Sequence, residues 1–450
     1  MSSSDLFGIG ASGARAYQAA MEAVSNNIAN TETGGYSRRS IELQESPAGS
    51  GTGVWYRAGA LFGGSTVGRV VRSGDDYLDA AARNTGTALA DVDQRARWMN
   101  DLQTALNDGS LGVGQRLTAM FSSVERLASN PTDTTLRTGL LFSFEQINTA
   151  FKQTHTDLVT VKDGIGQAAN NEVAALNDAL KQLAAANEGL RRSPEGTAPH
   201  VSLLDSRDQA LAEITKRLNV SVEFGKNDVA NVKYGSTTLV EDVDSIQVFV
   251  SQDSDGLLHF TAGANRGSAP ALADPTGGAL AGLAQSAIIT RDRIDTVNDL
   301  AEEYVQDINS WHMGGRTAAG AAGGAMLSFG GDAASLSVLI TDPADIAGAS
   351  AAGVVNGNLL AVNSIRGSGS VEDKWLGLIS SHGNLVNATL AEQTAASGRD
   401  EMAQAARADV SGVNLDREAA DLLRLQQAYQ ACARIIQVAK EVMDSLFSVV

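Results

Sequence analysis

The chain has 450 residues, of which 43% are hydrophobic and only 5% aromatic, and its formal net charge is −18. This length allows roughly two to four domains, and the abundance of glycine and alanine favours closely packed helices over a bulky aromatic core. A chain this acidic repels nucleic-acid phosphates and anionic lipid headgroups, so neither nucleic acid nor a membrane is an expected partner.

The first residues contain no basic segment followed by a continuous apolar run, and no stretch reaches the roughly 18 uninterrupted apolar residues of a membrane span. We therefore expect neither a secretory signal peptide nor a transmembrane helix. Cys432 is the single cysteine, which excludes an internal disulfide. It lies on the apolar side of a helical pattern, so it is expected to be a small packed residue.

Residues 4–30 are predicted to form a helix, because apolar and small residues recur at steps of three and four. Ser3 or Ser4 can cap its start, and the segment from Asn30 to Gly35 ends it. The expected face consists of Leu6, Ile9, Gly13, Tyr17, Ala20, Val24 and Ile28. Residues 36–75 are predicted to be extended and rich in turns, with short β-like runs such as 66–71.

Helical periodicity returns at 76–107, 114–129 and 132–190. The last of these helices would be about 90 Å long if Gly164 and Gly166 do not interrupt it.

Residues 193–202 contain two prolines and are predicted to be a loop, followed by a helix at 203–218. Strands are expected within 219–262, at 220–224, 245–250 and 257–260. The Asp-Ser-Asp-Gly run at 253–256 is a hairpin signal between the last two.

A long helix is predicted at 279–312. Residues 314–332 are a Gly/Ala-rich sequence and are expected to be a linker that buries little surface, before a short strand at 337–341. Helices return at 371–408 and 416–447.

The final helix carries a heptad pattern. Leu415, Leu422, Tyr429, Ile436, Met443 and Val450 recur every seven residues, and Leu425, Cys432, Ala439 and Leu446 occupy a second position of the same heptad. This stripe predicts lengthwise packing against another helix, which would be the other terminus or another copy of the chain.

The expected fold is therefore mainly α with a smaller β portion. It is an elongated, long helical bundle with a small β region, and its terminal helices pair as a coiled coil. Residues 1–75 and 400–450 would form a discontinuous terminal-helix domain. Residues 76–313 and 333–399 would form a rod-like helical domain with strands at about 219–262, and 314–332 would be the linker.

The sequence carries little that predicts chemistry. Residues 8–13 match the G-x-G-x-x-G pattern, but no strand precedes them, so close helix packing is favoured over a dinucleotide site. The five histidines are scattered, and Asp253 and Asp255 lack the other ligands of a calcium loop. Neither a nucleophile elbow nor a phosphate-binding loop is present. We expect no catalytic residues, no cofactor and no metal.

Two segments resemble a known family. Residues 25–39, Ser-Asn-Asn-Ile-Ala-Asn-Thr-Glu-Thr-Gly-Gly-Tyr-Ser-Arg-Arg, resemble the N-terminal motif shared by flagellar rod, hook and hook-associated axial proteins. Their Tyr-Ser-Arg ending looks like the form found in hook-associated protein 1. Residues 411–431 are similar to the C-terminal motif of the same family. Residues 127–133 and 203–211 also look like this family, so the resemblance spans nearly the whole chain in order.

The resemblance implies a non-enzymatic structural component of the bacterial flagellum that links hook to filament. It implies export through the flagellar type III apparatus after a transient cytoplasmic stage. The implied partners are a ring of copies of the chain itself, the hook protein, a second hook–filament junction protein, and an export chaperone at the C-terminal helix. Larger members carry an outermost β domain after the helix that ends near His312. Here only the 314–332 linker follows, so that domain is expected to be absent or minimal.

Assembly through the terminal helices is the expected function of the two chain ends. The expected interface residues are Leu6, Ile9, Tyr17, Val24, Ile28, Asn30, Tyr36, Leu415, Leu422, Leu425, Tyr429, Ile436, Met443 and Leu446. Alone, these helices do not offset the ~1–2 kcal/mol per residue of backbone ordering, so we expect both ends to become ordered on assembly. Tyr36, Arg38 and Arg39 are either subunit contacts or an ordinary solvated turn.

Three alternatives stay open at this point. The first is another flagellar axial protein, namely the hook protein, a distal-rod protein or the second junction protein. The second is a non-flagellar secreted coiled-coil scaffold or adhesin. The third is an enzyme with a site in 219–262, although no nucleophile, base and orienting group gather there.

Overall fold

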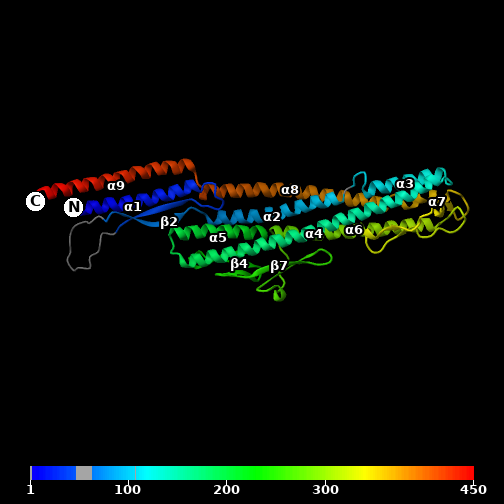
Figure 1. Cartoon of the computed structure of the whole chain (residues 1–450), viewed down its shortest axis with the longest axis horizontal. Helices are drawn as coiled ribbons and strands as arrows, with labels where there is room; N and C mark the ends of the chain where they lie inside the picture. Colours follow the sequence, from blue (N-terminus) through cyan, green and yellow to red (C-terminus); the bar gives the residue numbers. More distant parts are fainter. Residues whose placement is uncertain (1–2, 47–62, 107, 450) are drawn as a thin grey trace.

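The computed structural model describes residues 3–46, 63–106 and 108–449. Long helices run along the long axis of an elongated molecule, small sheets lie on one side of its middle, and both chain ends lie together at one extremity (Figure 1). The expected fold class, mainly helical with a small β portion, is confirmed.

The chain ends form what we call the terminal module. Helices α1 (Ser3–Ala29) and α9 (Leu415–Val449) lie side by side and antiparallel (Figure 1). Strands β1 (Arg39–Glu45) and β2 (Ser65–Arg72) form an antiparallel pair that packs on α1. The lengthwise pairing of the two terminal helices agrees with the heptad pattern.

Six helices form the rod, and α2 packs along α8 while α4 packs along α5 and α6. Their bounds are α2 (Asp76–Ala105), α3 (Val113–Ser129), α4 (Thr134–Arg192), α5 (Ala198–Arg217), α6 (Ala279–Met313) and α8 (Val371–Ser411).

Helix α4 has 59 residues, which corresponds to about 90 Å. Gly164 and Gly166 do not interrupt it. A Cβ on Gly164 would lie 3.1 Å from the Trp98 ring, and one on Gly166 would meet Gln252. These glycines therefore allow close packing.

Aspartate side chains define two helix starts. Asp75 accepts hydrogen bonds from the backbone N–H groups of Tyr77 and Leu78, at 2.9 and 3.1 Å, and so caps α2. Asp133, at the end of the 127–133 motif, caps α4 in the same way. Capping satisfies backbone donors that have no partner within the helix.

The predicted loop at 193–202 is too long, because α5 begins at Ala198. Pro199 lies in the first turn of α5, where its fixed φ suits a helix and its missing N–H costs nothing. Thr197 caps this turn by accepting from the backbone N–H of His200.

The β region is larger than predicted. Strands β3 (Ser221–Phe224), β4 (Ala230–Tyr234), β5 (Thr237–Glu241) and β6 (Asp244–Ser245) form one antiparallel sheet, and β7 (Gln247–Gln252) pairs with β8 (Leu258–Gly263). Asn187 and Asn177 on α4 hydrogen bond to the backbone of Ala230 and Val248 and hold both sheets on the rod. The turn at Asp253 is a hairpin turn, as predicted.

The prediction that residues 314–332 form a linker that buries little surface is wrong, because this segment packs against the rod. Strand β9 (Gly315–Arg316) pairs with β12 (Ala349–Ser350), and β10 (Leu327–Ser328) pairs with β11 (Ser337–Val338). The strand predicted at 337–341 is therefore present but shorter, since β11 ends at Val338. Met326 and Leu327 are buried. Asn309 on α6 binds their backbone, which low-complexity composition does not reveal. With α7 (Gly357–Ala361), residues 314–370 form what we call the tip.

One continuous hydrophobic core fills the rod and extends into the tip. Among the described residues it includes no side chain of α1, β1, β2 or α9. The terminal module therefore depends on its own contacts.

Candidate assembly interface at the terminal helices

The seam between α1 and α9 is built from small residues. A Cβ on Gly13 would lie 2.8 Å from the Sγ of Cys432, and one on Gly10 would lie 2.8 Å from the Cγ1 of Ile436. Ala439 is fully buried. The interpretation of the G-x-G-x-x-G pattern as a close-packing element is confirmed for Gly10 and Gly13, whereas Gly8 faces open space. Burial raises the pKa of the Cys432 thiol, so it stays protonated near neutral pH.

The expected interface residues occupy different environments. Val24 is buried, whereas Leu6, Ile9, Tyr17, Asn30, Tyr36, Leu422, Leu425, Ile436 and Met443 are half-buried. Ile28, Leu415 and Tyr429 are exposed. Leu446 belongs to α9, but its side chain lies outside the described residues. Their role in assembly stays a prediction.

Helix α9 carries a second apolar stripe, which the heptad analysis missed. Ile435, Val438 and Val442 follow one another at steps of three and four and are 39%, 54% and 42% exposed. We call these residues the outer stripe. Ile435 lies at the edge of the seam, where a Cβ on Gly10 would be 3.3 Å from its Cγ2, and Val438 and Val442 extend the stripe away from α1.

Asn27 is the centre of the polar end of the seam. It is fully buried, and its Oδ1 accepts from the Arg39 backbone N–H at 2.9 Å and from the Tyr36 hydroxyl at 2.8 Å. Its Nδ2 donates to the Arg39 carbonyl at 2.8 Å and to Glu418 Oε2 at 2.9 Å. One side chain thus joins α1, β1 and α9.

Glu418 completes this contact from the C-terminal motif. Its side chain is fully buried, and Oε1 accepts from Arg38 Nε at 2.6 Å. Arg38 also reaches Asp421 at 3.3 Å, and its backbone N–H donates to the Ser411 carbonyl. The two terminal motifs therefore bind each other. Sequence reasoning missed Glu418, although it precedes Leu425 by one heptad and so marks a polar position in the apolar stripe.

The side chains of the turn after α1 bond within the chain, and their contacts with another subunit stay a prediction. Arg39 stacks on the Tyr36 ring at 4.8 Å from the ring centroid. Burial, as the largest cause, raises the pKa of Tyr36.

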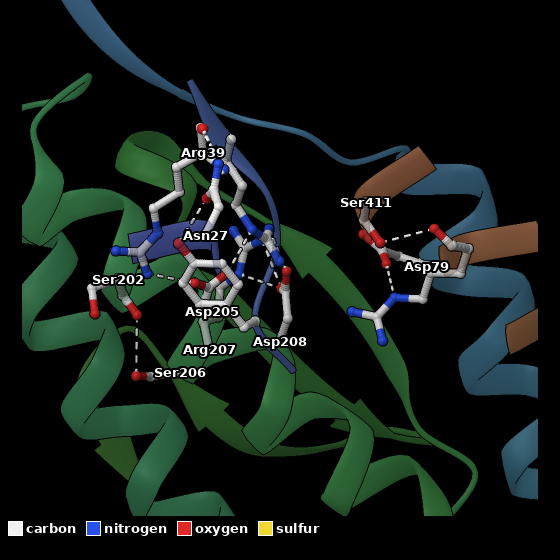
Figure 2. A network of polar contacts seen from close by, with 12 residues as sticks. Asn27, Arg39, Asp79, Ser202, Asp205, Ser206, Arg207, Asp208 and Ser411 are labelled. Atoms are coloured by element: carbon white, nitrogen blue, oxygen red, sulfur yellow. Dashed lines mark hydrogen bonds and ion pairs between the residues drawn. The ribbon is translucent and has the colours of Figure 1, made fainter. Parts of the chain in front are cut away.

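An ionic cluster joins the terminal module to the rod (Figure 2). Asp205 on α5 binds Arg39 and Arg72 with one oxygen each, both at 2.7 Å. Arg72 also contacts Asp208 at 2.6 Å. Burial acts to lower the pKa of Arg72, but Asp208 and Asp205 outweigh it and the pKa is raised. Both aspartates belong to the 203–211 motif, which therefore anchors the hairpin.

Candidate metal ligands do not cluster among the described residues. No group of three or more His, Cys, Asp or Glu side chains there could hold a metal ion. His382 and His312 are buried and hydrogen bonded to backbone groups. Within the same residues, every helix is too short or too polar to cross a membrane.

A rod that carries both chain ends as one paired module defines an elongated assembly subunit. A model of the flagellar hook-associated protein FlgK helical domain matches residues 99–327, just over half of the chain. A flagella basal body rod protein model matches residues 7–36, and the C-terminal model of the flagellar basal body rod FlgEFG proteins matches residues 404–449. The chain belongs to the flagellar hook-associated protein FlgK family. It is a structural component of the flagellum at the hook–filament junction, outside the cell, and not an enzyme.

Individual relatives agree over the full length. Flagellar hook-associated protein 1 of Bacillus subtilis (strain 168) is 24% identical over 490 residues, which cover 96% of each chain. The protein of that name from Escherichia coli (strain K12) is 25% identical over 548 residues, covering 97% of this chain and 98% of its own. That alignment is longer than the 450 residues of this chain, so the relative carries additional residues.

The fold also has a solved counterpart. The structure of the flagellar hook junction protein FlgK from Burkholderia pseudomallei matches with a TM-score of 0.66 at 14% identity, over 75% of this chain and all of the other. The suspected family is confirmed by the match to the FlgK helical domain, which also contains residues 219–262.

Proposed function

We propose that copies of the chain assemble into a ring through their terminal modules, between the hook protein and a second junction protein. The observation that carries this proposal is the outer stripe, since α1 touches it only at Ile435 and all three of its residues stay more than a third exposed. An exposed apolar face of this kind marks an interaction site. A neighbouring helix that covers Ile435, Val438 and Val442 would complete the packing.

The terminal module is marginal in the free subunit. Helices gain most of their stability from packing, and here α1 and α9 lie outside the rod core and depend on their seam, the β1–β2 hairpin and the bonds of Asn27 and Glu418. The module becomes fully ordered when neighbours cover the outer stripe. The expected interface residues then act in two groups, those of the seam and those that face a neighbour, such as Leu415 and Tyr429.

The domains follow from the same division. Residues 1–75 with α9 form the inner, assembling part, and the rod with its tip extends from it; residues 400–411, expected in the inner part, continue α8 along α2 of the rod. The tip occupies the place where longer relatives would carry an outermost domain, which agrees with the additional residues of the Escherichia coli protein.

Export precedes assembly. The chain leaves the cytoplasm unfolded through the flagellar type III apparatus, and a chaperone covers α9 beforehand. The outer stripe and the seam residues of α9 offer that chaperone an amphipathic helix with apolar positions on two sides.

The proposal is tested with a charge in the outer stripe. Val438→Asp places a carboxylate in the proposed interface, and Gln437→Asp places it on the adjacent exposed residue as a control. Both variants replace the wild-type gene, and export, filament formation and immunogold labelling of the flagella are compared. We expect Val438→Asp to be exported without forming a junction, so that hooks lack filaments and flagellin leaks into the medium. Normal filaments with Val438→Asp would contradict the proposal.

A further inference from the structure

The seam between α1 and α9 consists of layers spaced seven residues apart. Gly13 lies against Cys432, and Asn27 bonds Glu418. Because the helices run antiparallel, the same register places Ala20 opposite Leu425 and Leu6 opposite Ala439. Three of these four layers are apolar, and only the layer of Asn27 and Glu418 is polar.

The apolar layers specify the register weakly. A shift of α9 by one heptad places Cys432 opposite Leu6 in one direction and opposite Ala20 in the other. In both cases an apolar or small residue still faces another, and such repeating seams allow alternative registers.

The polar layer does not tolerate this shift. Glu418 is fully buried, and its two oxygens are bonded to Asn27 and Arg38. A shift in one direction moves Glu418 opposite Ala20, and the opposite shift brings Leu425 to Asn27. Either leaves a buried polar group without a partner, which is far more costly than an imperfect apolar contact.

We propose that Glu418, bonded by Asn27 and Arg38, fixes the register of α1 against α9, so that the two ends of the chain pair in a single arrangement. Glu418 is a positioning residue. The two terminal motifs, which supply Asn27, Arg38 and Glu418, would then serve to align the two helices. A fixed register would also place the outer stripe at one position along the axis of α1, where a neighbouring copy could cover it. This consequence for assembly rests on the proposed function. The register is the arrangement that α1 and α9 adopt whenever they pair in the single chain, and the disulfides measure it there.

Cys432 allows this register to be read directly. A Cβ on Gly13 would lie 2.8 Å from the Cys432 Sγ and 3.9 Å from its Cβ, which suits a disulfide. Gly13→Cys therefore reports the native register, whereas Ala20→Cys and Leu6→Cys report the two shifted ones. Gly8→Cys faces open space and is the negative control. Since Cys432 is the sole native cysteine, each variant forms one intramolecular disulfide at most.

The full-length chain with each reporter is equilibrated in a glutathione buffer, and intramolecular disulfides are measured by mass spectrometry. With Glu418 present, we expect a cross-link from Gly13→Cys only. Glu418→Leu should lower that yield by about tenfold or more and raise the yield of a shifted reporter. Glu418→Gln, which keeps the shape and one acceptor, should retain the native pattern.

A relocation variant keeps the test decisive if Glu418→Leu loses all cross-links. Glu418→Leu combined with Leu425→Glu moves the carboxylate by one heptad, so Ala20→Cys should become the reporter that cross-links. An unchanged Gly13→Cys yield in Glu418→Leu would overturn the proposal, because the chain connections at 412–414 would then set the register. Failure of the relocation variant to cross-link through Ala20→Cys would overturn it as well. Neither result bears on ring formation, which the outer-stripe variants test separately.

Discussion

The imidazole of His312 accepts a hydrogen bond from the backbone N–H of Ala347, with 2.9 Å between Nε2 and N. Its Nδ1 lies 2.7 Å from the Gly324 carbonyl and donates to it. The ring is fully buried, and this pair of bonds requires the neutral form. Burial is the largest cause that lowers the pKa of His312, although the Gly324 carbonyl and Asp345 act in the opposite direction.

This contact predicts how stability depends on pH. Below about pH 6.5 the unfolded chain binds a proton at His312 that the folded tip does not accept, so the free energy of unfolding decreases as the pH falls. Above that range the contribution is constant. Urea unfolding between pH 8 and pH 5 should show a smaller decrease in His312→Gln than in the wild type. Equal slopes in the two proteins would contradict this assignment.

The ionic cluster predicts a coupling between the terminal module and the rod. Asp205→Asn removes the charge that Arg39 and Arg72 share and should cost about 1–3 kcal/mol, because these side chains are largely shielded from solvent. Hydrogen exchange should become faster in β1 and β2 while the rod core is unaffected. Asp178→Asn is the control, since Asp178 forms only an exposed pair at 3.8 Å with Lys181. Similar effects of the two substitutions would refute the anchoring role of Asp205.

Two helical glycines should respond in opposite ways to the same substitution. Gly139→Ala on α4 adds a methyl group in open space and should stabilise the chain by about 0.5–1 kcal/mol. Gly282→Ala on α6 would press a Cβ onto the backbone carbonyl of Asp91 and should destabilise it. Denaturant midpoints of the two variants give the comparison, and a gain of stability in Gly282→Ala would disprove the close contact.

Substitutions in the seam and in the outer stripe should disrupt different contacts. Ile436 faces Gly10, so Ile436→Asp places a carboxylate between α1 and α9 and should abolish the disulfide between Gly13→Cys and Cys432. Val438→Asp should leave that disulfide intact, because its side chain points away from α1. Both should block incorporation at the junction, with export less affected. A cross-link that survives Ile436→Asp would show that the seam residues are misassigned.

The long helices and the terminal pairing were predictable because side-chain periodicity is a local property. Leu140, Phe144 and Phe151, for example, all lie on the buried side of α4. Glycines predicted helix ends less well, since Gly164 lies inside an unbroken helix. A glycine is needed there because the Trp98 ring of α2 packs closely against it, and the local sequence does not show this contact.

The tip and the polar layer could not be predicted for a related reason. The 314–332 segment has few large side chains, and Asn309 and His312 hold it in place through bonds to its backbone. Composition does not show which polar side chains reach which carbonyl. In the same way, Asn27 and Glu418 are 391 positions apart, so only the fold shows that the two motifs form one contact.

Hydrogen exchange of the free subunit and of the assembled junction tests the central claim, that the terminal module gains its order from its neighbours. We predict fast exchange in 3–29 and 415–449 in the free subunit, strong protection of these residues after assembly, and a rod that is protected in both states. Strong protection of both terminal helices in the free subunit, unchanged by assembly, would contradict the account.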